Sequence, residues 1–153
     1  MPFAYIPWPR FDRRAYLLLL DDQDRLMLCR ACCRGWTVPQ VRINAGANFQ
    51  GAATRFLANR FCIHDPSYGS LYGLHESSYG NTWEYDRQTS SRVFIVRITA
   101  KQSAAIQRIS NSHARWGIED LKSRRREINP EGAVLIATGY VEGWLPDGPV
   151  TLY

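Results

Sequence analysis

Four side chains in the middle of the chain could transfer protons near neutral pH. His64 follows an apolar helical pattern, His75 and Glu76 are adjacent, and Glu84 lies further along the chain. Histidine titrates near neutrality and acts as acid or base, and glutamate can do the same where its surroundings favour it. These four residues are therefore the candidate catalytic residues. The alternative for each of them is a solvated surface position.

The stretch between Arg25 and Ile63 contains six arginines and no Asp or Glu. Magnesium in proteins is held by hard oxygen ligands, usually carboxylates. From this stretch we therefore expect no metal site and no metal cofactor. Arginine presents a planar fork of donors that suits phosphate or carboxylate. Arg42, Arg55 and Arg60 are the candidates for holding an anion directly, and solvated charge is the alternative for Arg42 and Arg60.

Aromatic residues make up 12% of the chain, and many of them flank these arginines or the proton-transfer candidates. Such an excess suits either a large core or an aromatic-lined ligand cleft. Trp36, Phe56 and Tyr85 are the candidate ligand contacts among them. An apolar ring at Phe56, beside Arg55 on the same helical segment, favours an organic ligand with a hydrophobic part.

Four cysteines are present, at positions 29, 32, 33 and 62. Cys29 and Cys32 have the spacing of half a zinc site, but no second CxxC or HxxxH pair follows. We therefore expect free thiols.

The segments that position these candidates show alternating strand and helix patterns. Residues 13–20 and 25–31 are apolar runs around the polar turn 21–24, which predicts a hairpin. Pro and Gly then predict an irregular segment over 35–46. Residues 47–61 carry apolar side chains at i, i+3, i+4, i+7 and i+8, the single stripe of an amphipathic helix.

The second half of the chain contains one clear strand and two helical patterns. Residues 92–98 are rich in β-branched side chains, whereas 118–123 and 130–142 are predicted helices. Residues 64–92 are open to short strands or a long loop. The mixture predicts a single domain over residues 1–153 of the α+β class, with a mixed sheet and a short N-terminal extension over 1–12.

The order of hairpin, Trp-x-x-Pro loop, helix, strand, Trp-containing turn and last helix resembles the Nudix hydrolases. That family carries the box G-x5-E-x7-R-E-U-x-E-E-x-G-U, where U is aliphatic, and without gaps it runs here from Val41 to Ile63. Residues 114–121 resemble the family's Trp-x-x-x-Glu/Asp-x-Leu turn. The resemblance covers roughly residues 13–152 and implies a Nudix-like α/β/α sandwich.

The box itself departs strongly from the family pattern. Arg55, Leu57 and Ile63 keep the family's residue types, but Val41 and Cys62 replace the two glycines. The positions of the family's glutamates are occupied here by Ala47, Phe56, Asn59 and Arg60. The resemblance therefore implies a degenerate box that lacks the glutamates with which the family binds its catalytic metal.

These departures predict a divergent Nudix-fold protein that is not a magnesium-dependent pyrophosphohydrolase. We expect a repurposed, metal-independent enzyme that carries out isomerase-, cyclase- or lyase-type acid–base chemistry on a hydrophobic organic substrate, as in a biosynthetic pathway. The alternative is a catalytically inactive ligand-binding or regulatory protein that recognises an anionic small molecule.

Composition restricts the partners and the location. The net charge of +5 favours anionic partners. Residues 122–126 form a basic cluster, but no nucleic-acid recognition motif accompanies it, so a small-molecule ligand is expected in place of nucleic acid. No signal-peptide pattern is present, and the run Leu17–Leu20 is too short to cross a bilayer, so we expect a cytoplasmic protein with no membrane partner. The Nudix resemblance implies a homodimer.

Overall fold

The computed structural model describes residues 13–31, 35–44, 46–78, 87–109, 112–145 and 151–152, and within 70–78, 87–90 and 151–152 it describes the backbone alone. Its strands are β1 (Arg14–Leu20), β2 (Leu26–Arg30), β3 (Trp36–Thr37), β4 (Gln40–Arg42), β5 (Ser67–Ser78), β6 (Arg87–Arg97), β7 (His113–Trp116), β8 (Ile128–Asn129) and β9 (Thr151–Leu152). Its helices are α1 (Phe49–Phe61), α2 (Ala100–Ile109), α3 (Ile118–Ser123), the 3-10 turn η1 (Arg125–Glu127) and α4 (Glu131–Glu142).

The described strands form one mixed sheet with β1 near its centre. The strand order is β8-β3-β2-β1-β6-β5-β9, with β4 also paired to β1 and β7 to β2. β1 pairs in parallel with β6, from Arg14 opposite Ser91 to Leu20 opposite Arg97. The pairs β1–β2, β1–β4 and β5–β6 are antiparallel. The predicted hairpin of the first two strands is therefore confirmed. Its first strand also pairs with β6, which is distant in the sequence.

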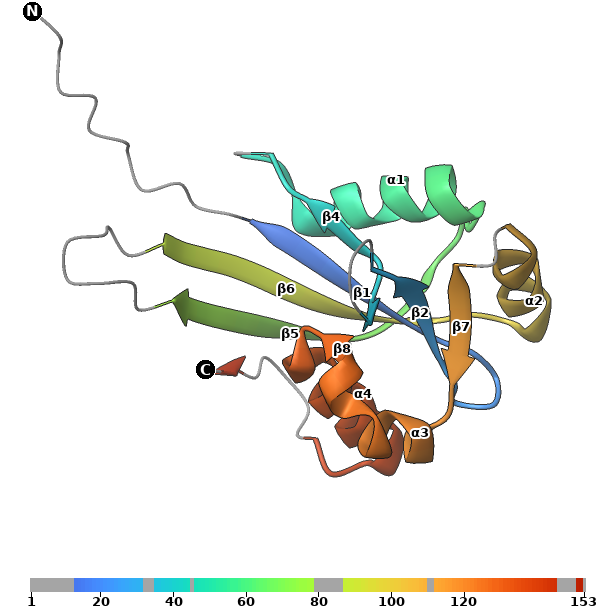
Figure 1. The fold of residues 1–153 in the computed structure, drawn as a ribbon. Coiled ribbons are helices and arrows are strands. Elements are labelled where there is room, and N and C mark those ends of the chain that lie inside the picture. Colours follow the sequence, from blue (N-terminus) through green and yellow to red (C-terminus); the bar gives the residue numbers. More distant parts are fainter. Residues whose placement is uncertain are drawn as a thin grey trace, which may run out of the picture.

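Both faces of the sheet are covered by helices, as Figure 1 shows. Leu18 and Leu20 of β1 belong to a core that α3 and α4 complete, whereas Leu17 and Leu19 belong to a second core that α1 and α2 complete. A strand buried on both faces needs a continuous apolar run, not an alternating pattern. This burial explains the four consecutive leucines and confirms the predicted α/β/α sandwich of the α+β class.

The turn between β1 and β2 is held by the buried carboxylate of Asp21, which is 1% exposed. One of its oxygens accepts hydrogen bonds from the backbone N–H groups of Gln23 and Arg25, both at 2.9 Å. The other accepts from Arg25 Nε at 2.9 Å and from Ser103 Oγ at 3.3 Å. Burial by itself raises the pKa of Asp21, but these donors outweigh it, so the pKa lies below its ordinary value. Ser103 belongs to α2, so the turn is also tied to a helix.

Several sequence-based expectations about elements were wrong. Residues 114–121 were expected to contain the family's Trp turn, but 113–116 are strand β7, which pairs with β2. The segment 35–46 contains the short strands β3 and β4. Helix α2 was not predicted, because its apolar stripe is weak: Ser103 and Ile106 are its buried residues. For residues 64–92, where short strands and a long loop were both open, the structure shows strands, because β5 and β6 pair over most of their length. Among the described residues, no helix is long and apolar enough to span a bilayer.

Candidate functional site

Helix α1 positions most of the candidate site, and its sequence explains both ends. The Asn48 side chain caps it by accepting a hydrogen bond from Gly51 N at 2.9 Å. Cys62 ends it in a left-handed conformation, where its N–H bonds to Ala58 O. Ala53, Leu57 and Phe61 form the stripe buried against the sheet. The residues beside this stripe therefore remain available to solvent.

A cavity of about 510 Å³ lies between α1 and the β4 edge of the sheet. We call it the α1–β4 cavity. Helix α1 contributes arginine, aromatic and amide side chains to it, and the β4 side contributes one apolar and one amide residue. The lining residues used below are Val41, Asn44, Arg55, Phe56, Asn59 and Arg60.

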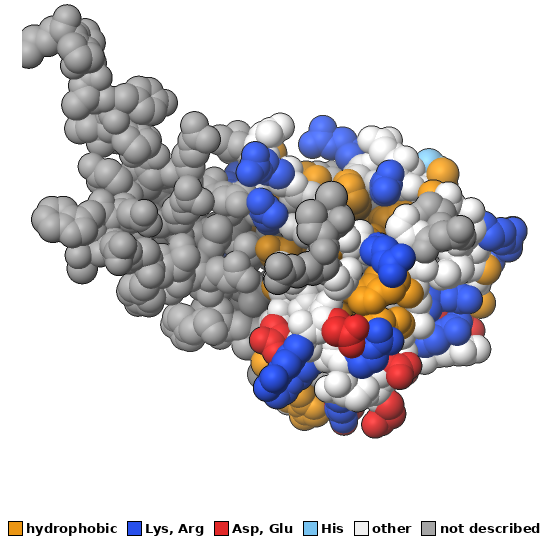
Figure 2. Space-filling model, viewed as in Figure 1, with side chains coloured by type: hydrophobic (Ala, Val, Ile, Leu, Met, Phe, Trp, Pro, Cys, Tyr) orange, Lys and Arg blue, Asp and Glu red, His pale blue; other side chains and the backbone are white. Residues whose placement is uncertain are grey.

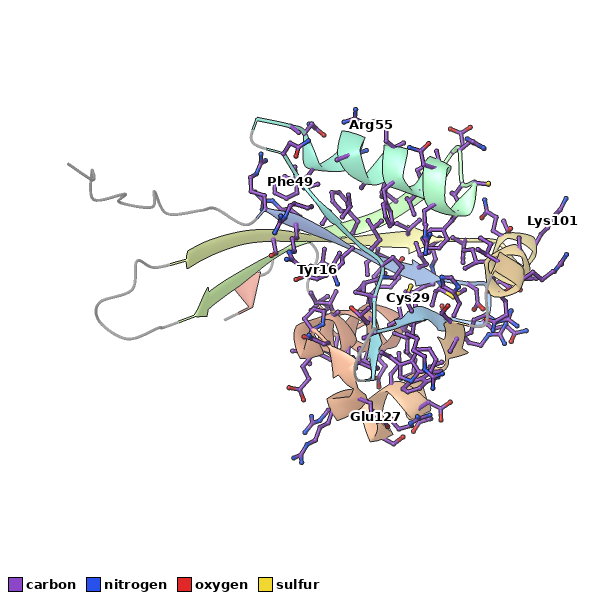
Figure 3. The ribbon with its side chains drawn as sticks, turned by 45° about the horizontal axis from the view of Figure 1, so that its top comes forward. Tyr16, Cys29, Phe49, Arg55, Lys101 and Glu127 are labelled. Atoms are coloured by element: carbon purple, nitrogen blue, oxygen red, sulfur yellow. The ribbon has the colours of Figure 1, made fainter. Side chains whose placement is uncertain are left out.

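The charge of the α1–β4 cavity is positive. Arg55 and Arg60 are exposed, and neither guanidinium makes a hydrogen bond or ion pair with another residue in the described part of the chain. Figure 3 shows Arg55 on the outer side of α1, pointing away from the sheet. On the face shown in Figure 2, Lys and Arg side chains appear in the upper part, where α1 lies, and the visible acidic side chains of the described residues lie lower down. Phe56 is half-buried beside these charges.

The donors of the α1–β4 cavity do not fit a divalent cation. Among the described residues that line it, the side-chain oxygen donors are the amides of Asn44 and Asn59, and none is a carboxylate. Two guanidinium groups at the same place repel a cation. Across the described residues, no group of three His, Cys, Asp or Glu side chains could hold a metal ion.

Only one of the four proton-transfer candidates, His64, has a side chain that the structure describes. His64 follows α1, is exposed and does not line the α1–β4 cavity. The backbones of His75 and Glu76 lie in β5, opposite Ser90 and Thr89 of β6, and their side chains are not described. Glu84 lies outside the described residues.

The candidate ligand contacts divide into two groups. Phe56 lines the α1–β4 cavity together with the arginines of α1. Trp36 packs on the opposite face of the sheet, where its ring contacts that of Trp116 with the centroids 5.7 Å apart. Arg42 is exposed on β4 and does not line the cavity. Tyr85 lies outside the described residues.

Cys29, one of the two described cysteines, lies near the end of α1 and has a free thiol, as does Cys62. Burial raises the pKa of Cys29 to about 11, and the charge of Arg60 offsets only part of this effect. The thiol is therefore protonated at neutral pH, which makes it a poor nucleophile and a poor metal ligand. Cys32 and Cys33 lie outside the described residues.

Comparison with solved structures shows which fold this is. C. elegans Ap4A hydrolase superposes with a TM-score of 0.64 at 12% sequence identity, over 89% of this chain and 100% of that one. A MutT/Nudix family protein from Listeria innocua gives a TM-score of 0.64 at 11% identity, over 87% and 94% of the two chains. Shewanella oneidensis NrtR, crystallised with a 27mer DNA, gives 0.61 at 13% identity, over 88% and 61%. No family model matches the sequence, and no curated protein matches it. The chain therefore has the Nudix fold, as the sequence resemblance implied.

Proposed function

We propose that this protein binds an anionic organic molecule in the α1–β4 cavity without a divalent cation. The observation that carries the proposal is the pair Arg55 and Arg60 beside Phe56, in a cavity whose described lining residues include no carboxylate. In an ordinary Nudix box, Phe56 and Arg60 would be glutamates. Here an apolar ring and a fixed positive charge take the place of negatively charged metal ligands.

The physical properties of the cavity favour a carboxylate or phosphate attached to an apolar body. A guanidinium is charged at any physiological pH and offers several donors in one plane. Asn44 and Asn59 add amide donors and acceptors, while Phe56 and Val41 add apolar surface. A volume of about 510 Å³ is in the range of small-molecule sites.

The fold alone leaves the choice between binding and catalysis open. It occurs in the Ap4A hydrolase and also in NrtR, which was crystallised with DNA. The described lining of the α1–β4 cavity offers arginine, asparagine and apolar side chains, and none of the residue types that usually act as general acid or base. Binding is therefore the proposal that this lining supports best, and acid–base catalysis requires groups from elsewhere.

Metal independence is the first expected result. Titration calorimetry of the protein with MgCl₂ or MnCl₂ should show no binding at millimolar ion, because the cavity opposes a cation with two guanidinium groups. The aromatic carboxylate 1-naphthoate serves as a probe anion and should bind with the same affinity in EDTA and in magnesium. Binding of 1-naphthoate that appears only with magnesium would contradict the proposal.

Variants of His64, His75 and Glu76 distinguish the binding proposal from the repurposed-enzyme hypothesis. If the cavity only binds its ligand, the variants His64→Ala, His75→Ala and Glu76→Gln should change the affinity for 1-naphthoate by less than about twofold, since no contact between these groups and the anion is needed. Calorimetry of the three variants measures this. A loss of about tenfold or more in one variant would place that proton-transfer group at the ligand and favour the enzyme hypothesis.

A further inference from the structure

A second cavity, of about 690 Å³, lies at the opposite end of α1, where the helix begins. We call it the Phe49 cavity. Arg13, which precedes β1, lines it together with Phe49 of α1 and with Arg92 and Phe94 of β6. It shares no lining residue with the α1–β4 cavity. The two cavities are therefore separate candidate sites on one helix.

Two guanidinium groups flank the Phe49 ring in this cavity. The Arg13 guanidinium carbon lies 4.4 Å from the ring centroid, and that of Arg92 lies 5.5 Å from it. Figure 3 shows Phe49 between the first turn of α1 and the sheet. Cation–π contacts at these distances hold the guanidinium groups near the ring and leave their N–H edges available for an anion.

The two arginines differ in how firmly they are held. Arg13 donates to the backbone carbonyls of Asn44 and Ala47, both at 3.2 Å, and these bonds fix its orientation. Arg92 is exposed, and its guanidinium group contacts the Phe49 ring but makes no hydrogen bond or ion pair with another described residue. The residue that pairs with Arg92 on the neighbouring strand β5 is Gly73, which has no side chain. Most of the donors of Arg92 are therefore free for a ligand.

The described lining of the Phe49 cavity has no negative charge that balances its two arginines. Neither arginine forms an ion pair with another described residue, and no Asp or Glu is among the described residues that line the cavity. Two positive charges in one hollow repel each other, and a group with two negative charges would relieve this repulsion. A phosphate monoester carries a charge of −1.5 to −2 at neutral pH and presents several acceptor oxygens.

We propose that the Phe49 cavity is a second anion site that binds a phosphate monoester between Arg13 and Arg92. The charges match, since the two guanidinium groups face a dianion. The buried Phe94 and the half-buried Phe49 supply apolar surface next to the phosphate. This site is distinct from the α1–β4 cavity and does not depend on the ligand proposed there.

Calorimetry with phenyl phosphate as the probe tests the proposal on the full chain. We expect saturable binding that Arg92→Ala weakens by about tenfold or more, because a charge-assisted hydrogen bond is lost. Arg92→Lys keeps the charge but loses the planar fork, and its affinity should lie between the two. Circular dichroism confirms that both variants are folded. The matched control Arg108→Ala changes an exposed arginine of α2 that lines neither cavity, and it should bind normally.

Three outcomes would overturn the proposal. The first is phenyl phosphate binding that does not saturate at millimolar concentration. The second is an Arg92→Ala variant that binds as tightly as the unaltered chain. The third is benzoate, a monoanion with the same ring, binding as tightly as phenyl phosphate. The double variant Arg55→Ala/Arg60→Ala separates the two sites, since it removes the arginines of the α1–β4 cavity and should leave unchanged the phenyl phosphate binding that Arg92→Ala weakens.

Discussion

The double variant Arg55→Ala/Arg60→Ala is expected to bind 1-naphthoate at least about 100-fold more weakly than the unaltered chain. A hydrogen bond to a charged group contributes about 1.5–3 kcal/mol, and about 1.4 kcal/mol corresponds to a tenfold change in affinity. Both arginines are exposed and make no hydrogen bond or ion pair within the described residues, so the fold should be unaffected. Calorimetry in EDTA measures the change.

A control variant that loses the same amount of charge elsewhere distinguishes direct contact with 1-naphthoate from long-range electrostatic attraction. Arg108→Ala/Arg126→Ala removes two exposed arginines that do not line the α1–β4 cavity. Its affinity for 1-naphthoate should fall by less than about threefold at physiological salt, because exposed charges beyond about 8 Å are largely screened. If both double variants weaken binding equally, the arginines act only through net charge, and the proposed site is wrong.

Replacing Asp21 with alanine should have the largest effect on stability. The change removes the acceptor for the backbone N–H groups of Gln23 and Arg25 and leaves them without their partner in the turn. Breaking a buried, hydrogen-bonded ion pair typically costs about 3–5 kcal/mol, and we expect about 3 kcal/mol here because Arg25 is partly exposed. Urea unfolding at pH 7 measures the free energy. Asp22→Ala, at the exposed neighbouring position, is the control and should change it by less than about 0.5 kcal/mol.

The pKa of Asp21 sets the sign of the accompanying pH dependence. Its pKa is lower in the folded state than its ordinary value. Its stabilising effect is therefore fully present above the unfolded pKa, about 4, and is lost as the pH falls through the folded value. The difference in unfolding free energy between the unaltered chain and Asp21→Asn should shrink in that acidic range. A difference that stays constant from pH 7 down to pH 2 would show that the carboxylate charge is not what stabilises the turn.

The parts of the fold and site that depend on local periodicity were predictable from the sequence. The stripe at i, i+3 and i+4 places Leu57 in the core and Arg55 and Arg60 beside the stripe, where they line one cavity. Helix spacing alone determines this arrangement, and no long-range contact is needed. Phe56 was expected within the stripe, but it is half-buried and lines the same cavity.

The remaining parts depend on contacts between distant segments. Trp36 lies in a strand of two residues, too short for alternation to indicate which face it occupies. Arg13 and Arg92 come together only because β1 pairs in parallel with β6. Nothing in the residues near either arginine indicates that pairing. The Phe49 cavity was therefore missed, although Phe49 itself belongs to the predicted helix.

The parallel pairing of β1 with β6 also has a consequence for how the chain folds during synthesis. β1 leaves the ribosome before its partner along its whole length, β6, which is complete only at Arg97. Until then, the leucines of β1 lack one flanking strand, and the hairpin with β2 covers only part of its edge. Contacts so distant in sequence make folding slow, because a long loop must close first. The nascent chain therefore exposes an apolar segment until β6 has emerged, and this segment is where chaperones would bind and where aggregation would begin.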